Sequence, residues 1–144
     1  MTVRVAFVCV QNAGRSQMST AVAERERAER GLEDTVEILT GGTDPADSVH
    51  EEVVEIMDEI GVDLSDREPR EIGTGELNAC DYVATMGCST LDLDADGPDV
   101  RDWALDDPDG QDLDAVRAIR DEIEGRVGDL FDEIERAVED GRQG

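Results

Sequence analysis

Lysine is absent from this chain, and all 13 of its basic residues are arginine. Asp and Glu together number 38, which gives a formal net charge of −25. This balance argues against a nucleic-acid partner, because proteins that bind nucleic acid present a basic surface to the phosphates. A large acidic surplus keeps a protein soluble in concentrated salt, so the missing lysine favours a halophilic protein over an ordinary acidic one.

Other features are also scarce. The chain has no run of about 18 apolar residues and no charged, then apolar, leader, so we expect neither a membrane span nor export. Its three cysteines are an odd number without a repeating spacing, which does not suit a secreted disulfide framework. One histidine and three scattered cysteines supply no usual set of metal ligands, and we expect no metal or other cofactor. These absences favour a cytoplasmic protein.

The hydrophobic pattern alternates between short apolar runs, typical of strands, and three-to-four spacing, typical of helices. It predicts strands at 3–8, 36–39, 82–86 and 100–105, and helices at 15–30, 51–60, 75–79 and 116–138. This alternation predicts a single α/β domain over residues 1–144, with three layers. A four-stranded parallel sheet would carry helices on both faces, and a ligand would bind beyond the carboxyl ends of the strands.

The segment from Cys9 to Arg15 joins the first predicted strand to the first predicted helix. Its backbone N–H groups can turn inward, toward the point that the positive end of the helix also faces. Arg15 adds a planar fork of donors that matches a tetrahedral oxyanion. The segment therefore predicts a site for a phosphate-like oxyanion made of Val10, Gln11, Asn12, Ala13, Gly14 and Arg15.

Cys9 ends the strand beside this predicted anion site. Helix amino ends and nearby guanidinium groups lower the pKa of cysteine thiols, so we expect the Cys9 thiol to ionise readily. Ser16 is placed to donate a hydrogen bond to the resulting thiolate. The pattern predicts a nucleophilic cysteine under a bound anion. The alternative is a buried cysteine that closes a strand next to a helix-capping serine.

Three stretches carry a resemblance to a known family. Cys-x5-Arg-Ser follows the first predicted strand, and 103–110 and 117–123 match an Asp-Pro loop and the final helix. Over nearly its whole length the chain resembles the low-molecular-weight protein tyrosine phosphatases and the arsenate reductases that share their fold. The phosphatases usually carry proline after Arg-Ser, whereas Gln17 and Met18 resemble the reductases.

The resemblance implies roles for residues outside the loop. Asp107 matches the general acid that protonates the departing oxygen, with Asp106 as the second choice and a plain Asp-Pro turn as the alternative. Cys88 follows the third predicted strand and is expected to attack Cys9 once an arsenic adduct has formed there. Arsenite would leave, and a Cys9–Cys88 disulfide would remain for a cellular thiol to reduce. Alternatively, Cys88 is a small buried residue that closes a strand.

The chain also departs from its thioredoxin-coupled relatives, which carry a third cysteine followed by proline. Gly97 stands before Pro98 here, so either thioredoxin or glutaredoxin reduces the disulfide directly, or a low-molecular-weight thiol attacks the arsenic adduct. Cys80 precedes the third predicted strand and is expected in the core. The single histidine, His50, is expected to face solvent or cap a helix, without a catalytic role.

Three functions remain open from the sequence. An arsenate reductase is favoured, because Gly110 follows Asp-Pro-Asp where the phosphatases place aromatic residues, and a pocket without aromatic walls suits a small anion. The second is a low-molecular-weight phosphatase that hydrolyses phosphomonoesters through a phosphocysteine at Cys9. The third is an anion-binding module without turnover, in which Asp107 would have no task.

Overall fold

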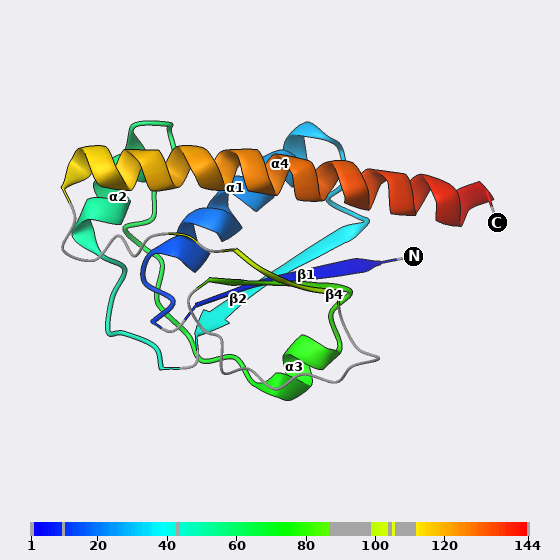
Figure 1. The fold of residues 1–144 in the computed structure, drawn as a ribbon, viewed down its shortest axis with the longest axis horizontal. Coiled ribbons are helices and arrows are strands. Elements are labelled where there is room, and N and C mark those ends of the chain that lie inside the picture. The colour runs from blue at the N-terminus through cyan, green and yellow to red at the C-terminus, as the bar shows by residue number, and fades with distance from the viewer. Residues whose placement is uncertain are drawn as a thin grey trace.

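The computed structural model describes residues 2–9, 11–42, 44–86, 99–103, 105 and 112–143. Strands and helices alternate along the first half of the chain, and one long helix ends it (Figure 1). The elements are β1 (Val3–Cys9), α1 (Arg15–Glu29), β2 (Val36–Gly42), α2 (Glu51–Asp58), α3 (Thr74–Asn78), β3 (Tyr82–Met86), β4 (Asp99–Asp102) and α4 (Leu113–Gln143).

The four strands form one parallel sheet in the order β2-β1-β3-β4. β1 lies between two neighbours, and its register pairs Cys9 with Gly42 on one side and with Met86 on the other. The carboxyl ends of three strands therefore meet beside Cys9. In an open parallel sheet ligands bind at this edge, and the predicted anion site lies here.

Both faces of the sheet are covered, which confirms the predicted three-layer architecture (Figure 1). Val5 and Phe7 of β1 point into the larger core, which is shared with α1, α2 and α4. Ala6 and Val8 point the opposite way, into a smaller core beneath α3 that contains Leu77. This strict alternation follows from the pleat of a strand, and it explains why β1 is apolar at nearly every position.

Three strands differ from the prediction: β1 ends one residue later, at Cys9, and β2 and β4 differ more. β2 continues to Gly42, because residues 40–42 pair with the last three residues of β1. β4 begins at Asp99 and ends at Asp102, whereas the apolar pattern predicted 100–105. Trp103 and Leu105 are apolar because they are buried in the larger core, where the Trp103 ring lies 5.9 Å from that of Phe7. The apolar residues that are buried after β4 therefore could not be distinguished, by sequence pattern, from residues of the strand.

Segment 70–72 docks against the end of β2. The Gly42 N–H donates to the Arg70 carbonyl, and the Ile72 N–H donates to the Gly42 carbonyl. Gly41 makes this close approach possible, because a Cβ at this position would overlap the Ile72 side chain. The docking brings the Arg70 backbone next to the loop that follows β1.

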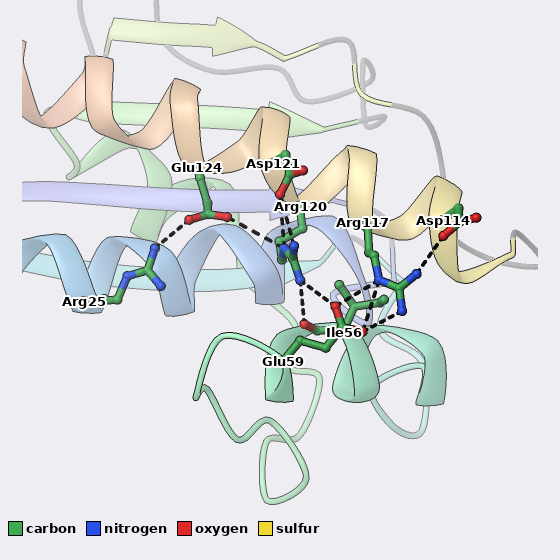
Figure 2. Close-up of polar contacts among 8 residues, drawn as sticks. All are labelled: Arg25, Ile56, Glu59, Asp114, Arg117, Arg120, Asp121 and Glu124. Carbon is green, nitrogen blue, oxygen red and sulfur yellow. Dashed lines mark hydrogen bonds and ion pairs between the residues drawn. The ribbon is translucent and has the colours of Figure 1, made fainter.

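Ion pairs join α4 to α1 and α2 (Figure 2). Arg117 and Arg120 of α4 both contact Glu59, the residue that follows α2, at 2.7 and 3.0 Å. Arg25 of α1 contacts Glu124 of α4 at 2.8 Å. Hydrogen bonds from Arg117 lower the pKa of Glu59 to about 2, with a further contribution from Arg120. Arginine thus supplies the positive partner in each of these pairs.

Candidate active site

The loop after β1 directs its backbone N–H groups by anchoring its carbonyl groups elsewhere. The Gln11 carbonyl accepts from the Ala46 N–H at 2.9 Å, and the Ala13 carbonyl accepts from the His50 N–H at 3.0 Å. In a trans peptide the carbonyl and the following N–H point in opposite directions. The N–H groups of Asn12 and Gly14 therefore point away from segment 46–50.

Asn12 makes the tightest bend of the loop. Its φ of 52° lies in the left-handed region, which Asn tolerates better than most residues. In this conformation its N–H reaches the Cys9 sulfur, 3.1 Å from nitrogen to sulfur. The sulfur also contacts the Ser16 hydroxyl at 2.9 Å, and Cys9 is 3% exposed as a free thiol. Two polar groups of the chain thus converge on a nearly covered sulfur.

A chain of hydrogen bonds determines which way the Ser16 hydroxyl points. The Thr40 hydroxyl donates to the Phe7 carbonyl at 3.2 Å, so it accepts from the Asn12 side-chain nitrogen at 2.9 Å. That nitrogen donates its second hydrogen to the Ser16 oxygen at 2.7 Å. Since the Ser16 oxygen is an acceptor toward Asn12, its own hydrogen is left for the Cys9 sulfur.

The other end of the Asn12 side chain is held as firmly. Its amide oxygen accepts from the Arg70 backbone N–H and from the Gln17 side-chain nitrogen, each at 3.0 Å. A backbone N–H can only donate, so the contact with Arg70 fixes which end of the Asn12 amide is oxygen. Both hydrogen donors aimed at the Cys9 sulfur therefore depend on Asn12, one through its backbone and one through Ser16.

Arg15 connects the loop to the segment after β4. Its guanidinium donates to the Leu105 carbonyl at 3.0 Å, and its side chain is half-buried at the first position of α1. Leu105 stands two positions before Asp107 in the sequence. Arg15 thus connects the predicted anion site to the segment that leads to Asp107, the predicted general acid.

The structure brings together part of the predicted site. Cys9, Asn12 and Ser16 are buried and in mutual contact, and Ala13 and Gly14 are buried beside them. Gln11 is exposed, with only its backbone engaged. Four further predicted positions lie outside the described residues: Val10, Cys88, Asp106 and Asp107.

The sequence analysis did not predict three hydrogen bonds to the Asn12 side chain, which involve Thr40, the Arg70 N–H and the Gln17 amide. Thr40 lies at the end of a strand paired with β1, and this placement was the available signal. The Arg70 contact depends on the docking of segment 70–72, for which the local sequence carries no signal. Gln17 was noted for its type, not for its contact with Asn12.

The remaining singled-out residues lie apart from the sulfur. Cys80 is buried in the smaller core, as predicted, and its thiol donates to the Glu76 carbonyl at 3.4 Å. Burial raises the pKa of the Cys80 thiol. His50 precedes α2 as its N-cap residue and acts on the loop through its backbone, without a side-chain capping bond. Within the described ranges no helix is long and apolar enough to cross a membrane, and no cluster of His, Cys, Asp and Glu could hold a metal ion.

Sequence comparison identifies the family to which this fold and this loop belong. The chain belongs to the low molecular weight phosphotyrosine protein phosphatase family, whose sequence model matches residues 4–140. A protein of Halobacterium salinarum named "Putative arsenate reductase" is 74% identical over 133 residues, which are 92% of this chain and 94% of that protein. This relative fits the halophilic character predicted from the acidic, lysine-free composition.

Two solved structures resemble the chain closely. The thioredoxin-dependent arsenate reductase of Corynebacterium glutamicum is 34% identical with a TM-score of 0.78, over 94% of this chain and 63% of that one. An arsenate reductase in its phosphate-binding state is 29% identical with a TM-score of 0.77, over 92% of this chain and 99% of that one. Both share the overall fold of this chain.

Proposed function

We propose that this protein is an arsenate reductase in which the Cys9 thiolate attacks arsenate. The observation that supports this most strongly is the pair of hydrogen donors aimed at the Cys9 sulfur, from Ser16 and the Asn12 N–H. Donors of this kind favour the ionised form of a thiol, and the thiolate is the nucleophile. The reductase relatives share the fold around this loop, and one of them was solved in a phosphate-binding state.

The anion would bind beside the sulfur at the amino end of α1. The N–H groups of residues 10–14 and the Arg15 guanidinium would hold its oxygens, as expected for an oxyanion at a helix amino terminus. The inward direction of the Gly14 N–H, opposite the anchored Ala13 carbonyl, supports this assignment. Such a cradle suits arsenate and phosphate alike, because both are tetrahedral.

The reaction needs two sulfurs and an acid. Cys9 forms a bond to arsenic(V) while one oxygen leaves as water, protonated by Asp107, or by Asp106 if Asp107 is not the acid. The Cys88 thiolate then attacks the Cys9 sulfur, and the electron pair of the sulfur–arsenic bond goes to arsenic. Arsenite leaves, arsenic has gained two electrons, and a Cys9–Cys88 disulfide carries the oxidation.

An external thiol restores the two sulfurs. Thioredoxin, glutaredoxin or a low-molecular-weight thiol can supply the two electrons, and the thioredoxin dependence of the Corynebacterium relative supports the first. All of these reductants belong to a reducing compartment, so we infer a cytoplasmic protein. A donor comparison with purified protein in molar salt identifies the reductant.

Cysteine variants test the proposal. Cys88→Ser should abolish repeated turnover of arsenate and leave hydrolysis of an aryl phosphate nearly intact, because a phosphocysteine needs only water. Cys9→Ser should abolish both activities, and Cys80→Ser, in the smaller core, should abolish neither. Arsenate turnover that survives in Cys88→Ser overturns the resolving role. Aryl phosphate hydrolysis without any arsenate reduction identifies a phosphatase instead.

A further inference from the structure

We propose that Gln17 is a positioning residue for the Cys9 thiol, which it orients through Asn12 and Ser16. This inference deepens the proposed function and rests on it, because orienting the thiol matters only if Cys9 is the nucleophile. The contacts themselves are observed independently of that function. None of the described hydrogen bonds of Gln17 reaches the sulfur, and those of its side chain reach the predicted anion site only at the Asn12 side chain. Its side-chain nitrogen donates to the Asn12 amide oxygen at 3.0 Å.

Two consecutive residues of α1 hold opposite ends of one amide. The Ser16 oxygen accepts from the Asn12 side-chain nitrogen, whereas the Gln17 nitrogen donates to the Asn12 side-chain oxygen. A flipped Asn12 amide would turn its oxygen toward Ser16 and its nitrogen toward Gln17. The Ser16 hydrogen would then go to Asn12, and the Cys9 sulfur would lose one of its two donors.

Gln17 adds a second donor to the Asn12 amide orientation that the Arg70 N–H already favours. The Arg70 N–H also donates to the Asn12 oxygen, so two donors oppose the flipped amide when Gln17 is present and one when it is absent. The same contact fixes the orientation of Gln17 itself. If the Gln17 amide were reversed, its oxygen would face the Asn12 oxygen.

The cost of Gln17 to stability points to a role in function. Gln17 is 2% exposed, and within the described parts of the chain its amide oxygen is buried without a hydrogen-bond partner. A buried acceptor without a partner destabilises the folded state, because it has lost its hydrogen bonds to water and forms none within the protein. An apolar side chain of equal length would avoid this cost. What the amide contributes in return is its donor to Asn12.

Gln17→Met is the direct test, because methionine keeps the length and removes both the donor and the unpaired acceptor. The readout is the alkylation rate of Cys9 by iodoacetamide across pH, measured on the Cys9 peptide by mass spectrometry in molar salt. We expect Gln17→Met to slow this alkylation about tenfold at pH 7 and to move the profile to higher pH. The melting temperature should stay unchanged or rise.

Thr20→Val is the matched control on the same helix. The buried Thr20 hydroxyl donates to the Ser16 carbonyl at 2.7 Å and has no described bond to Asn12. This variant should lower the melting temperature and leave the Cys9 rate within about twofold. The proposal is overturned if Gln17→Met leaves the Cys9 alkylation rate within twofold of wild type. It is also overturned if the slower alkylation is accompanied by a lower melting temperature.

A second variant covers the case in which Gln17→Met does not fold. Gln17→Leu also removes the donor to the Asn12 oxygen, and leucine is a strong helix former. It should slow Cys9 alkylation at pH 7 as Gln17→Met does, and an unchanged rate would again contradict the proposal. Alkylation requires no arsenate. If the wild-type protein fails to reduce arsenate, the proposed function is wrong, but the alkylation test of Gln17 can still be carried out.

Discussion

The Ser16 hydroxyl lies 2.9 Å from the Cys9 sulfur, and because its oxygen accepts from Asn12, its own hydrogen is available to a Cys9 thiolate. Neither residue could enforce this direction alone. It is set by the Thr40 hydroxyl, the Arg70 N–H and the Gln17 amide, which together fix the Asn12 amide. The reactivity of the thiol thus depends on groups in four separate segments of the chain.

Ser16→Ala should slow the attack of Cys9 about tenfold or more, because it removes a hydrogen bond that strengthens when the sulfur is charged. The measurement is arsenate reduction under single-turnover conditions, alongside alkylation of Cys9. Ser19→Ala is the control, since its hydroxyl donates to the Arg15 carbonyl at 2.8 Å and does not reach the sulfur. Equal rates in Ser16→Ala and wild type would contradict the assigned direction of the bond.

Asn12 combines a backbone role with a side-chain role, and two variants separate them. Both Asn12→Gly and Asn12→Ala lose the side-chain network, so both should have low arsenate turnover. Only Ala adds the cost of the left-handed φ of 52°, about 1 kcal/mol. Urea unfolding should therefore find Asn12→Gly more stable than Asn12→Ala, and the reverse order would show that the backbone is not under this constraint.

Gly41→Ala should destabilise the protein by about 1–3 kcal/mol, because its Cβ would overlap Ile72. The displaced segment 70–72 would also withdraw the Arg70 N–H from Asn12, and thiol reactivity should fall. Gly125→Ala is the control, since a Cβ there meets open space inside α4 and should stabilise by about 0.5–1 kcal/mol. Combining Gly41→Ala with Ile72→Gly, which removes the Ile72 Cβ that the new Cβ would overlap, should restore part of the lost activity.

Glu59 should make stability depend on acid. The pKa of Glu59 is lowered to about 2 in the folded protein from its ordinary value near 4.5. Its contribution is therefore fully present above pH 4.5 and is lost as the pH falls toward 2. The difference in unfolding free energy between wild type and Glu59→Gln should be largest at neutral pH and vanish near pH 2. Because the pair is exposed, molar salt should reduce this difference.

Salt should raise catalysis. A chain with a net charge of −25 repels a divalent anion in dilute buffer, whereas at about 1 M salt the Debye length falls to about 3 Å. Only donors close to the anion, such as Arg15 and the loop amides, then act on it. The kcat/KM for arsenate should rise between dilute buffer and molar KCl, and a maximum in dilute buffer would contradict this account.

The core of the site follows from local sequence, whereas its support does not. Cys9, Arg15 and Ser16 could be placed because a strand, a short loop and a helix leave little freedom to the residues between them. Thr40 and the Arg70 N–H reach Asn12 only through strand pairing and through the docking of segment 70–72, which depend on distant residues. The predicted end of β4 was too late because Trp103 and Leu105 are apolar and buried but follow Asp102, the last residue of the strand.

Cys9 is 3% exposed, so its sulfur is too well covered to meet the surface of another protein. Electrons from a protein reductant would therefore have to enter the oxidised enzyme at the opposite sulfur of the disulfide. Cys9 would then be the leaving group, and the Ser16 and Asn12 hydrogens that prepare it for attack would also stabilise its departure. The same two donors would thus serve the opening and the closing steps of each catalytic cycle.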